Sequence, residues 1–296
     1  MSEFLQQLLN GLSLGAIYAL IALGYTMVYG VLRFINFAHC DVFMVGAFIG
    51  YYLGQHLPHG TIWGGTLVLL CAMIGCALLG MLIERLAYRP LRGAPTLNVL
   101  ITAIGVSLFL QYTGQLVFGA TPRTFPPLFP SVNFNVGTLV FSSNQLLVIG
   151  VAVTLMVALR LIVFRTRIGT AMRAVSLNPN AARLVGVNND VVISFTFGLG
   201  SALAAAGGIL YALNYPSIDP LMGVMPGLKA FVAAILGGIG NIPGAALGGL
   251  LLGTVETFVS GSRFSTYKDA IAFAILIVIL LFRPAGLLGK PTVEKV

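Results

Sequence analysis

The residues of this chain best suited to chemistry lie in a short polar segment between two long apolar runs. Arg33, Asn36, His39 and Asp41 bring a cation, an amide, an imidazole and a carboxylate into nine consecutive positions. Ionisable side chains at membrane depth are costly, so they usually pair with one another or line a water-filled cavity. We therefore predict that these four residues form a polar constellation beside a water-filled path. The alternative is structural: Asn36 or Asp41 caps the next helix while Arg33 reaches lipid headgroups.

No residue pattern in the sequence indicates catalysis or metal binding. His39 has no water-activating cluster beside it, and Cys40, Cys71 and Cys76 lack the spacing of metal ligands. The sequence also lacks the G-x-x-x-x-G-K-[ST] loop that cradles nucleotide phosphates. We expect no catalytic residue, no metal site and no cofactor in this chain.

One further acid, Glu256, is isolated within an apolar run. It is either a proton relay or the partner of a nearby cation, and pairing with Arg263 or Lys268 is the simpler interpretation. The first role would couple the chain to an ion gradient, whereas the second would be structural.

Charged residues are few and clustered, and this pattern indicates a membrane protein. The 296 residues include 16 Lys or Arg and 8 Asp or Glu, and 58% are hydrophobic. Mean hydropathy is +0.98, and residues 4–32, 42–83, 93–122 and 230–255 contain no charge. A helix needs roughly 20 apolar residues to cross a bilayer core of about 30 Å. The fold class is therefore an all-α polytopic membrane protein, with residues 1–296 forming a single transmembrane domain.

The apolar runs predict about nine transmembrane helices, within a range of eight to ten. Residues 31–40 and 226–243 are expected to be broken or re-entrant, which accounts for that range. The first run lacks a small-residue cleavage site and is followed by further spans, so we expect a retained helix rather than a signal peptide. The predicted spans are 5–30, 41–55, 62–84, 97–118, 145–164, 191–212, 226–240, 244–260 and 268–284.

Basic residues predict how the chain is oriented, because they accumulate on the cytoplasmic side of membrane proteins. They cluster in residues 84–92, in residues 160–183 and at the C-terminus, which carries Arg283, Lys290 and Lys295. The loops between these clusters contain Arg123 as their only basic residue, whereas Lys229, Arg263 and Lys268 fit the scheme less well. We predict an outer N-terminus and a cytoplasmic C-terminus. The net charge of +8 then reflects orientation rather than binding to nucleic acid.

A polar segment at residues 165–189 contains the signals of one short cytoplasmic helix. Asn178 is a typical N-cap, Pro179 suits the first helical position, and Gly186 is a typical stop. A lone capped helix on this face is typical of a docking element for a soluble partner, and the alternative is a helix lying on lipid headgroups. The candidate coupling residues are Asn178, Pro179, Ala181, Ala182, Arg183, Leu184 and Gly186.

Glycines recur at intervals of four residues, as in Gly46, Gly50 and Gly54. Such spacing places them on one helix face, where a second helix can approach closely. The face either packs tightly within the subunit or lets helices slide during a functional cycle. A second group combines such a face with a helix break and comprises Gly237, Gly238, Gly240, Pro243, Gly244 and Gly248.

Four segments together resemble a known family. They are NFAHCD at 36–41, the loop at 173–186 with NPNAARLVG, GGIGNIPG at 237–244 and FRPAGLLG at 282–289. Their order and spacing are similar to those of bacterial high-affinity branched-chain amino acid ABC transporter permeases, H-type subunit, over nearly the whole chain. Cys40 departs from that pattern, in which glycine usually follows Ala-His. This puts in doubt any close backbone approach at that point.

The resemblance implies a type II-like ABC importer permease in the bacterial inner membrane. It implies a heterodimer with a paralogous permease subunit and two cytoplasmic ATPase subunits that bind ATP and Mg. It also implies an extracytoplasmic binding protein that delivers leucine, isoleucine or valine. Residues 178–186 would then dock in the ATPase, and the constellation around Asp41 would border the translocation pathway.

Three alternatives stay open. Similar permeases import urea or short amides. A secondary transporter would use Asp41, Glu256 or Asp269 as an ion relay, but it leaves the capped cytoplasmic helix unexplained. A channel or membrane scaffold would need no energy source.

Overall fold

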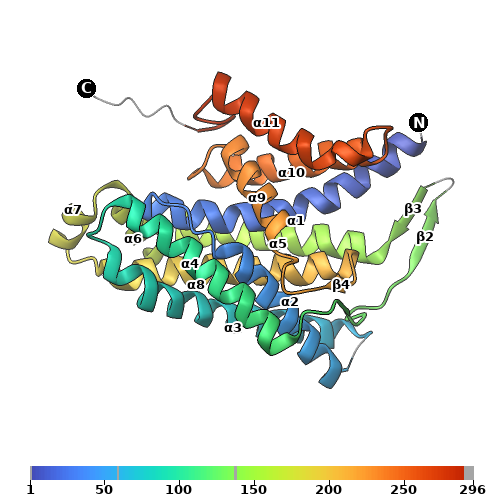
Figure 1. Cartoon of the computed structure of the whole chain (residues 1–296), viewed down its shortest axis with the longest axis horizontal. Coiled ribbons are helices and arrows are strands. Elements are labelled where there is room, and N and C mark those ends of the chain that lie inside the picture. Colours follow the sequence, from blue (N-terminus) through green and yellow to red (C-terminus); the bar gives the residue numbers. More distant parts are fainter. Residues whose placement is uncertain (1, 59, 137–138, 290–296) are drawn as a thin grey trace.

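The computed structural model describes residues 2–58, 60–136 and 139–289, which form a helical bundle (Figure 1). Lys290 and Lys295, two of the residues that predict a cytoplasmic C-terminus, lie outside the described residues. The long helices are α1 (Ser2–Leu32), α2 (His39–His56), α3 (Ile62–Ile83), α4 (Thr96–Phe118), α5 (Ser143–Arg165), α8 (Asn189–Asn214), α9 (Val224–Gly237), α10 (Ile242–Ser260) and α11 (Lys268–Phe282). The shorter elements are η1 (Glu84–Tyr88), η2 (Arg89–Leu91), α6 (Arg167–Leu177), α7 (Pro179–Leu184), η3 (Ser265–Tyr267) and the strands β1 (Arg123–Thr124), β2 (Asn133–Val136), β3 (Leu139–Ser142) and β4 (Ser217–Ile218).

The bundle has two distinct ends. Helix α7 projects from one, which we call the α7 end, and the antiparallel β2–β3 hairpin projects from the other, the hairpin end (Figure 1). Helix α1 runs from the hairpin end to the α7 end, and α11 runs in the same direction. At the hairpin end the ring centroids of Phe4 and Phe258 are 5.1 Å apart. The basic clusters of residues 84–92 and 160–183 therefore meet at the α7 end, as the charge pattern predicts.

Each of the nine predicted ranges contains a helix, and seven helical segments in the described part of the chain are long and apolar enough to span a membrane. The two exceptions are α2, which begins with His39 and Asp41, and the 14-residue α9. The chain also leaves helix at both expected interruptions, residues 33–38 and 238–241. Polar residues at the start of α2 make that helix less apolar. The glycines after α9 end that helix after 14 residues.

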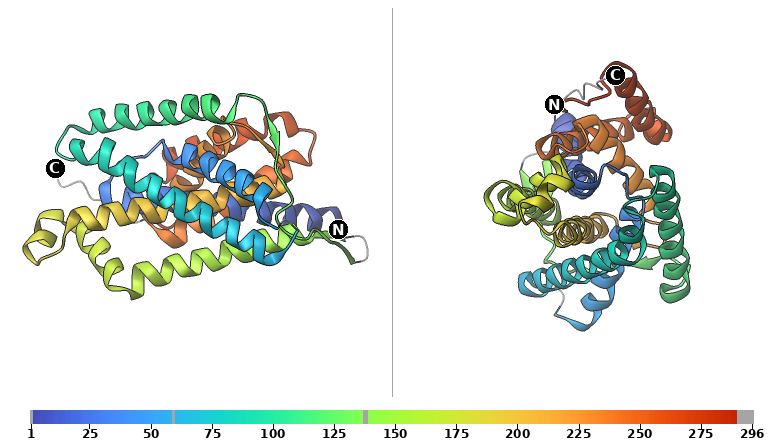
Figure 2. Two further views of the ribbon diagram at one scale, coloured as in Figure 1. Left: turned by 90° about the horizontal axis from the view of Figure 1, so that it is seen from below. Right: turned by 90° about the vertical axis from the view of Figure 1, so that its left-hand side faces the viewer.

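Helix α1 is the centre of the fold. Within its most apolar 18-residue window 94% of residues are buried, compared with 78% for α8 and 6% for α11. Helices α10, α8, α9 and α5 pack around it, as the view along the bundle shows (Figure 2). Helices α4 and α11 lie at the periphery, where large apolar side chains such as Phe109 and Leu281 are exposed.

Glycines allow α1 and α10 to touch along their backbones. A Cβ added at Gly253 would overlap the backbone of Gly15, and one at Gly249 would overlap the backbone of Ala19. Gly46 on α2 faces Ala205 of α8 in the same way. These positions are the tight packing faces that small residues provide between membrane helices.

Replacing Gly253 by valine is expected to push α1 and α10 apart and lower the midpoint of thermal unfolding in detergent. Overpacking a tight contact typically costs about 1–3 kcal/mol. Gly150→Val on α5 is the matched control, because nothing lies within 4 Å of a Cβ added there. Equal thermal stability of the two variants would contradict the packing role of Gly253.

Candidate functional site

Helix α7 carries its own start and stop signals. The side chain of Asn178 accepts hydrogen bonds from the backbone N–H groups of Asn180 (3.0 Å) and Ala181 (3.1 Å). Pro179 occupies the first turn, and Gly186 adopts φ +85°, the left-handed conformation that favours glycine at a helix end. These local interactions explain why a helix of only six residues forms at this position.

Two large apolar side chains are exposed at the end of α7, beside the exposed polar residues Asn180 and Arg183. Ala182 is buried against the bundle, whereas the side chains of Leu184 and Val185 are 88% and 78% exposed. Large apolar side chains so exposed beside a polar loop are typical of an interaction site. Because α7 lies at the tip of the molecule (Figure 1), a partner can reach this surface without touching the spans.

A second helix, α6, connects α5 to α7 and was not expected from the sequence. Thr166 caps it by accepting from the N–H of Gly169 (3.1 Å), and Met172 and Val175 are buried. A Cβ at Gly169 would overlap the carbonyl groups of Ile162 and Val163, so glycine permits the sharp turn from α5 into α6. The polar loop thus contains two helices instead of one. The sequence signal that could have predicted α6 is the apolar spacing of Met172 and Val175 within this basic segment.

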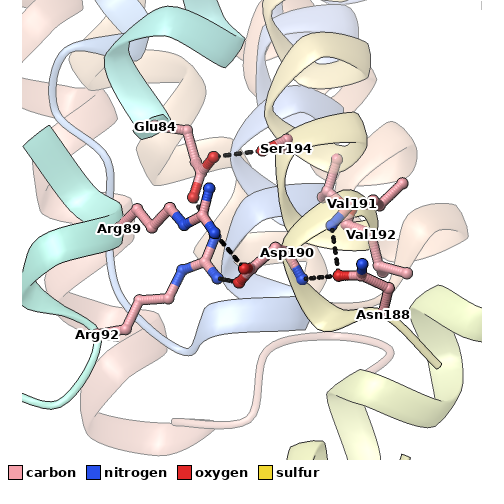
Figure 3. A network of polar contacts seen from close by, with 9 residues as sticks. Glu84, Arg89, Arg92, Asn188, Asp190, Val191, Val192 and Ser194 are labelled. Carbon is pink, nitrogen blue, oxygen red and sulfur yellow. Dashed lines mark hydrogen bonds and ion pairs between the residues drawn. The ribbon is translucent and has the colours of Figure 1, made fainter. Parts of the chain in front are cut away.

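A charged network lies at the start of α8 (Figure 3). The Asp190 carboxylate at the start of α8 pairs with the guanidinium groups of both Arg89 and Arg92. Arg92 also pairs with Glu84, whose side chain is fully buried and accepts a hydrogen bond from the Ser194 hydroxyl. The network therefore ties the end of the α3–η1–η2 segment to the first turns of α8.

Asn189 links this network to α7. Its side-chain amide donates to the carbonyl of Pro179 (2.9 Å), while the neighbouring Asn188 caps α8 by accepting from the N–H of Asp190 (3.1 Å). These adjacent residues thus connect α7 directly to the start of α8. Sequence reasoning missed the role of Asp190, because this acid is 98 positions from its partner Arg92.

The predicted polar constellation divides into two parts. Asn36, His39 and Asp41 are buried, and each contacts a different element: Asn36 accepts from the Tyr88 hydroxyl (2.6 Å), and Asp41 accepts from the Gln111 amide (3.0 Å). His39 lies against Gly24 of α1. Arg33 instead is exposed at the α7 end, where its guanidinium lies 3.5 Å from the carbonyl of Ser176.

Asp41 is unusual among the buried acids. Glu84 pairs with Arg92 and Glu256 pairs with Lys229, but Asp41 forms no ion pair within the described residues. Its second carboxylate oxygen has no hydrogen-bond partner there, and neither has His39 Nε2. An uncompensated buried carboxylate is costly and is usually functional in a membrane protein.

Cys40 is accommodated by glycines on the neighbouring helix. Its thiol lies 2.7 Å from the Tyr25 hydroxyl, and a Cβ at Gly227 would overlap its side chain. Gly223 faces the carbonyl of Cys40 equally closely. Close approach is therefore retained at this point, with the glycines on the α9 side of the contact.

The partner of Glu256 differs from the predicted one. Instead of Arg263 or Lys268, it pairs with Lys229 on α9 (2.6 Å) and accepts a hydrogen bond from Tyr18 on α1 (2.9 Å). Lys229 also pairs with Asp269 of α11 (2.6 Å). The correction has a simple reason: Lys229 is buried between α9 and α10 beside Glu256, whereas Arg263 and Lys268 are exposed beyond the end of α10.

The segments 237–244 and 282–289, two of those that carry the family resemblance, meet at the break between α9 and α10. Gly238 and Gly240 adopt φ of +104° and +90°, and Asn241 caps α10 by accepting from the N–H of Gly244 (3.3 Å). The 282–289 segment completes this break, since the N–H groups of Leu287 and Leu288 donate to the last carbonyls of α9. Gly237, Gly244 and Gly248, together with Pro243 at the start of α10, let the two helices fold back on each other.

Within the described residues, no group of three or more His, Cys, Asp or Glu side chains is arranged to hold a metal ion. The candidate site has three parts. They are the exposed helix α7, the charged network at the start of α8 and the buried polar segment around Asp41.

Comparison with known proteins finds full-length similarity. Residues 7–280 match the family described as branched-chain amino acid transport system / permease component. The chain is 45% identical to the high-affinity branched-chain amino acid transport system permease protein BraD of Pseudomonas aeruginosa, covering 99% of this chain and 98% of BraD. It is 43% identical to the corresponding permease LivH of Escherichia coli, with the same coverage. A probable LivH of Methanocaldococcus jannaschii is 29% identical over 91% of this chain and 88% of that protein.

Proposed function

Because this chain belongs to the family of branched-chain amino acid transport system permeases, we propose that it carries leucine, isoleucine and valine across the bacterial inner membrane. The observation that carries this proposal is the similarity to BraD and LivH from end to end, at 45% and 43% identity. The chain is a permease component and a multi-pass membrane protein, so the energy for accumulation comes from other subunits of the system.

The partners we propose are a paralogous permease, two cytoplasmic ATPases that bind ATP and Mg, and an extracytoplasmic binding protein. Two features support a second permease subunit. Helices α4 and α11 contribute little to the core of this subunit, and both carry rows of exposed apolar side chains. Lipid covers part of that surface, and the partner permease would cover the rest.

Helix α7 is proposed to be the ATPase-coupling helix. Its support comes from its position at the tip, its internal caps and the exposure of Leu184 and Val185. When the ATPases close, α7 would move as a rigid body. The Asn189–Pro179 contact and the Asp190 ion pairs would pass that movement to α8 and to the end of α3. Interfaces of this kind switch between discrete packings rather than deforming continuously.

The constellation of Arg33, Asn36, His39 and Asp41 is proposed to border the translocation pathway, the three buried residues from within the spans and Arg33 from the α7 end. Asp41 is the residue with the strongest support, since its carboxylate is buried without a cationic partner in the described part of the chain. The structure-forming contacts of Asn36 and His39 suggest that these two residues hold the segment in place.

Asp41→Asn is expected to reduce leucine uptake at unchanged expression. The substitution keeps the size of the side chain and its capacity to accept from Gln111, but it removes the charge. Initial uptake rates in cells that express matched amounts of permease provide the measurement, and Asn98→Asp on exposed α4 is a control for altered charge in the spans. Uptake in Asp41→Asn equal to that of the parent would make the constellation structural.

The orientation is testable by labelling. In a variant without native cysteines, Ser131→Cys is expected to react with an impermeant maleimide added to intact cells. Leu177→Cys, whose native side chain is 80% exposed, should react only after the membrane is permeabilised. Labelling of Leu177→Cys in intact cells would mean that the proposed orientation is inverted.

Reconstitution tests the function itself. The permease pair, the ATPases and the binding protein should together accumulate leucine in proteoliposomes when ATP is supplied. Uptake that persists without ATPases and stops on addition of an uncoupler would indicate an ion-coupled transporter. Accumulation of urea or a short amide, with no leucine uptake, would replace the substrate while keeping the mechanism.

A further inference from the structure

A cavity of about 540 Å³ lies at the α7 end, between α7 and the spans. Its walls come from the ends of α1 and α6, from η1 and η2, and from the first turns of α4 and α8, and α7 closes one side. This volume lies in the range of about 300–1,000 Å³ that is typical of small-molecule sites. Docking of an ATPase on the exposed side of α7 does not by itself explain a cavity between α7 and the spans.

Part of the wall is aliphatic. Val31, Leu91, Val99, Val175 and Ile193 line it, and Val31, Val99 and Val175 are otherwise buried in the bundle. A branched aliphatic group would bury apolar surface against these side chains, which is favourable by about 25 cal/mol for each Å² removed from water.

The rest of the wall provides both a donor and an acceptor that are unused. Arg92 Nε and Asn189 Oδ1 are buried and have no hydrogen-bond partner within the described residues. Asn189 is 5% exposed, and its amide group is held in place by its bond to Pro179. Arg33 and Arg183 also line the cavity, and neither forms an ion pair in the described part of the chain. Guanidinium groups suit a carboxylate, and the Asn189 carbonyl oxygen suits an ammonium group.

The backbone of Arg33 adds a second, independent observation. Arg33 has φ +56°, and it is the only non-glycine residue with positive φ among those described. It follows the last residue of α1, a position where glycine is usual because it adopts this conformation without strain. Residues held in such a conformation cluster at ligand-binding and other functional sites.

We propose that this cavity is a binding site for an aliphatic α-amino acid on the cytoplasmic side of the permease. The carboxylate binds the guanidinium groups of Arg33 and Arg183, the ammonium group binds Asn189 Oδ1, and the side chain lies against the aliphatic wall. The proposal rests on the proposed function, from which it takes the class of ligand. Because α7 forms one wall, occupancy and the position of the coupling helix affect each other reciprocally.

Equilibrium binding of radiolabelled leucine to the purified permease–ATPase complex, without binding protein, tests this site. The parent should bind leucine saturably. Arg33→Asn should bind about tenfold more weakly, the loss expected for one charge-assisted hydrogen bond. Asparagine tolerates positive φ, so this variant should keep the fold of the parent. Arg167→Asn, on the same face but outside the cavity, should bind like the parent.

A steric variant provides a second measurement. Thr96→Trp places an indole ring in the cavity from the start of α4 and should abolish binding. Leu97→Trp is its control, because Leu97 is the next residue and is 63% exposed, away from the cavity. The compound 4-methylpentanoate, which is leucine without its ammonium group, should compete about tenfold less well than leucine.

Stimulation of ATP hydrolysis by leucine-loaded binding protein separates the two proposals. A complex that shows this stimulation but binds no leucine by itself would overturn the cavity site alone. Unchanged binding in both Arg33→Asn and Thr96→Trp would overturn it as well. A complex without stimulation by any branched-chain amino acid would overturn the proposed function, and the cavity proposal with it.

Discussion

Leu184→Glu is expected to abolish the stimulation of ATP hydrolysis by substrate-loaded binding protein. The native side chain is 88% exposed on α7, so the variant should fold and insert like the parent. On docking, the new carboxylate would be buried against the ATPase without a partner, at a cost of several kcal/mol. A cost of that size weakens association by at least about 100-fold, so little ATPase should remain bound.

The measurements are ATP hydrolysis in proteoliposomes and co-purification of the ATPase with tagged permease. Leu184→Met is the matched control, because it keeps an apolar side chain of similar volume and should retain stimulation. Full stimulation in Leu184→Glu would show that the ATPase docks elsewhere. A loss in Leu184→Met as large as in Leu184→Glu would indicate a role for the shape of this residue instead of its apolar character.

Lys229→Met should have the largest effect on stability. Lys229 is buried and pairs with both Glu256 and Asp269, each at 2.6 Å. Removing the cation leaves Glu256 buried without a counter-charge, and breaking a buried pair in this way typically costs about 3–5 kcal/mol. Helices α9, α10 and α11 all depend on this lysine, so we expect a marked fall in the yield of monodisperse protein and in its unfolding temperature.

Lys268→Met is the control for the loss of a positive charge, because Lys268 is exposed at the start of α11 and should tolerate the change. The double variant Lys229→Met/Glu256→Gln should regain part of the lost stability, since it no longer buries the Glu256 charge. If Lys229→Met were as stable as Lys268→Met, the three ion-paired residues would not hold these helices together.

Local signals in the sequence are sufficient to predict α7. Its cap, its proline and its terminal glycine lie within the nine residues from Asn178 to Gly186, and the structure places each of them in the expected backbone position. The nine helical ranges could be predicted for a similar reason, because the length of an apolar run depends only on neighbouring residues.

Long-range pairing could not be predicted. Glu256 pairs with Lys229, 27 positions away, although Arg263 and Lys268 are nearer to it in the sequence. Asp190 joins Arg89 across 101 positions. Ion pairs of this kind depend on which helices become neighbours, and no local pattern contains that information.

Whether a helix lies at the centre or the edge of the bundle could not be predicted from its hydropathy either. The apolar window of α5 has the higher mean hydropathy, 2.7, yet only 22% of it is buried, whereas that of α1 has a mean of 1.7 and is 94% buried. Lipid is as apolar as any protein core, so the lipid-facing helices can be the most hydrophobic ones. Small residues on α1, more than its hydropathy, mark it as the central helix.

The central position of α1 has a consequence for how the protein is made. Its most extensive contacts are with α10 and α8, which begin at Ile242 and Asn189. At synthesis rates of about 5–20 residues per second, α1 waits roughly ten seconds to most of a minute for these neighbours. During that time its glycine faces are open to lipid or to the insertion machinery. A chain whose synthesis stops before α10 therefore lacks the helix that α1 contacts most extensively, so complete packing of the central helix depends on finishing translation.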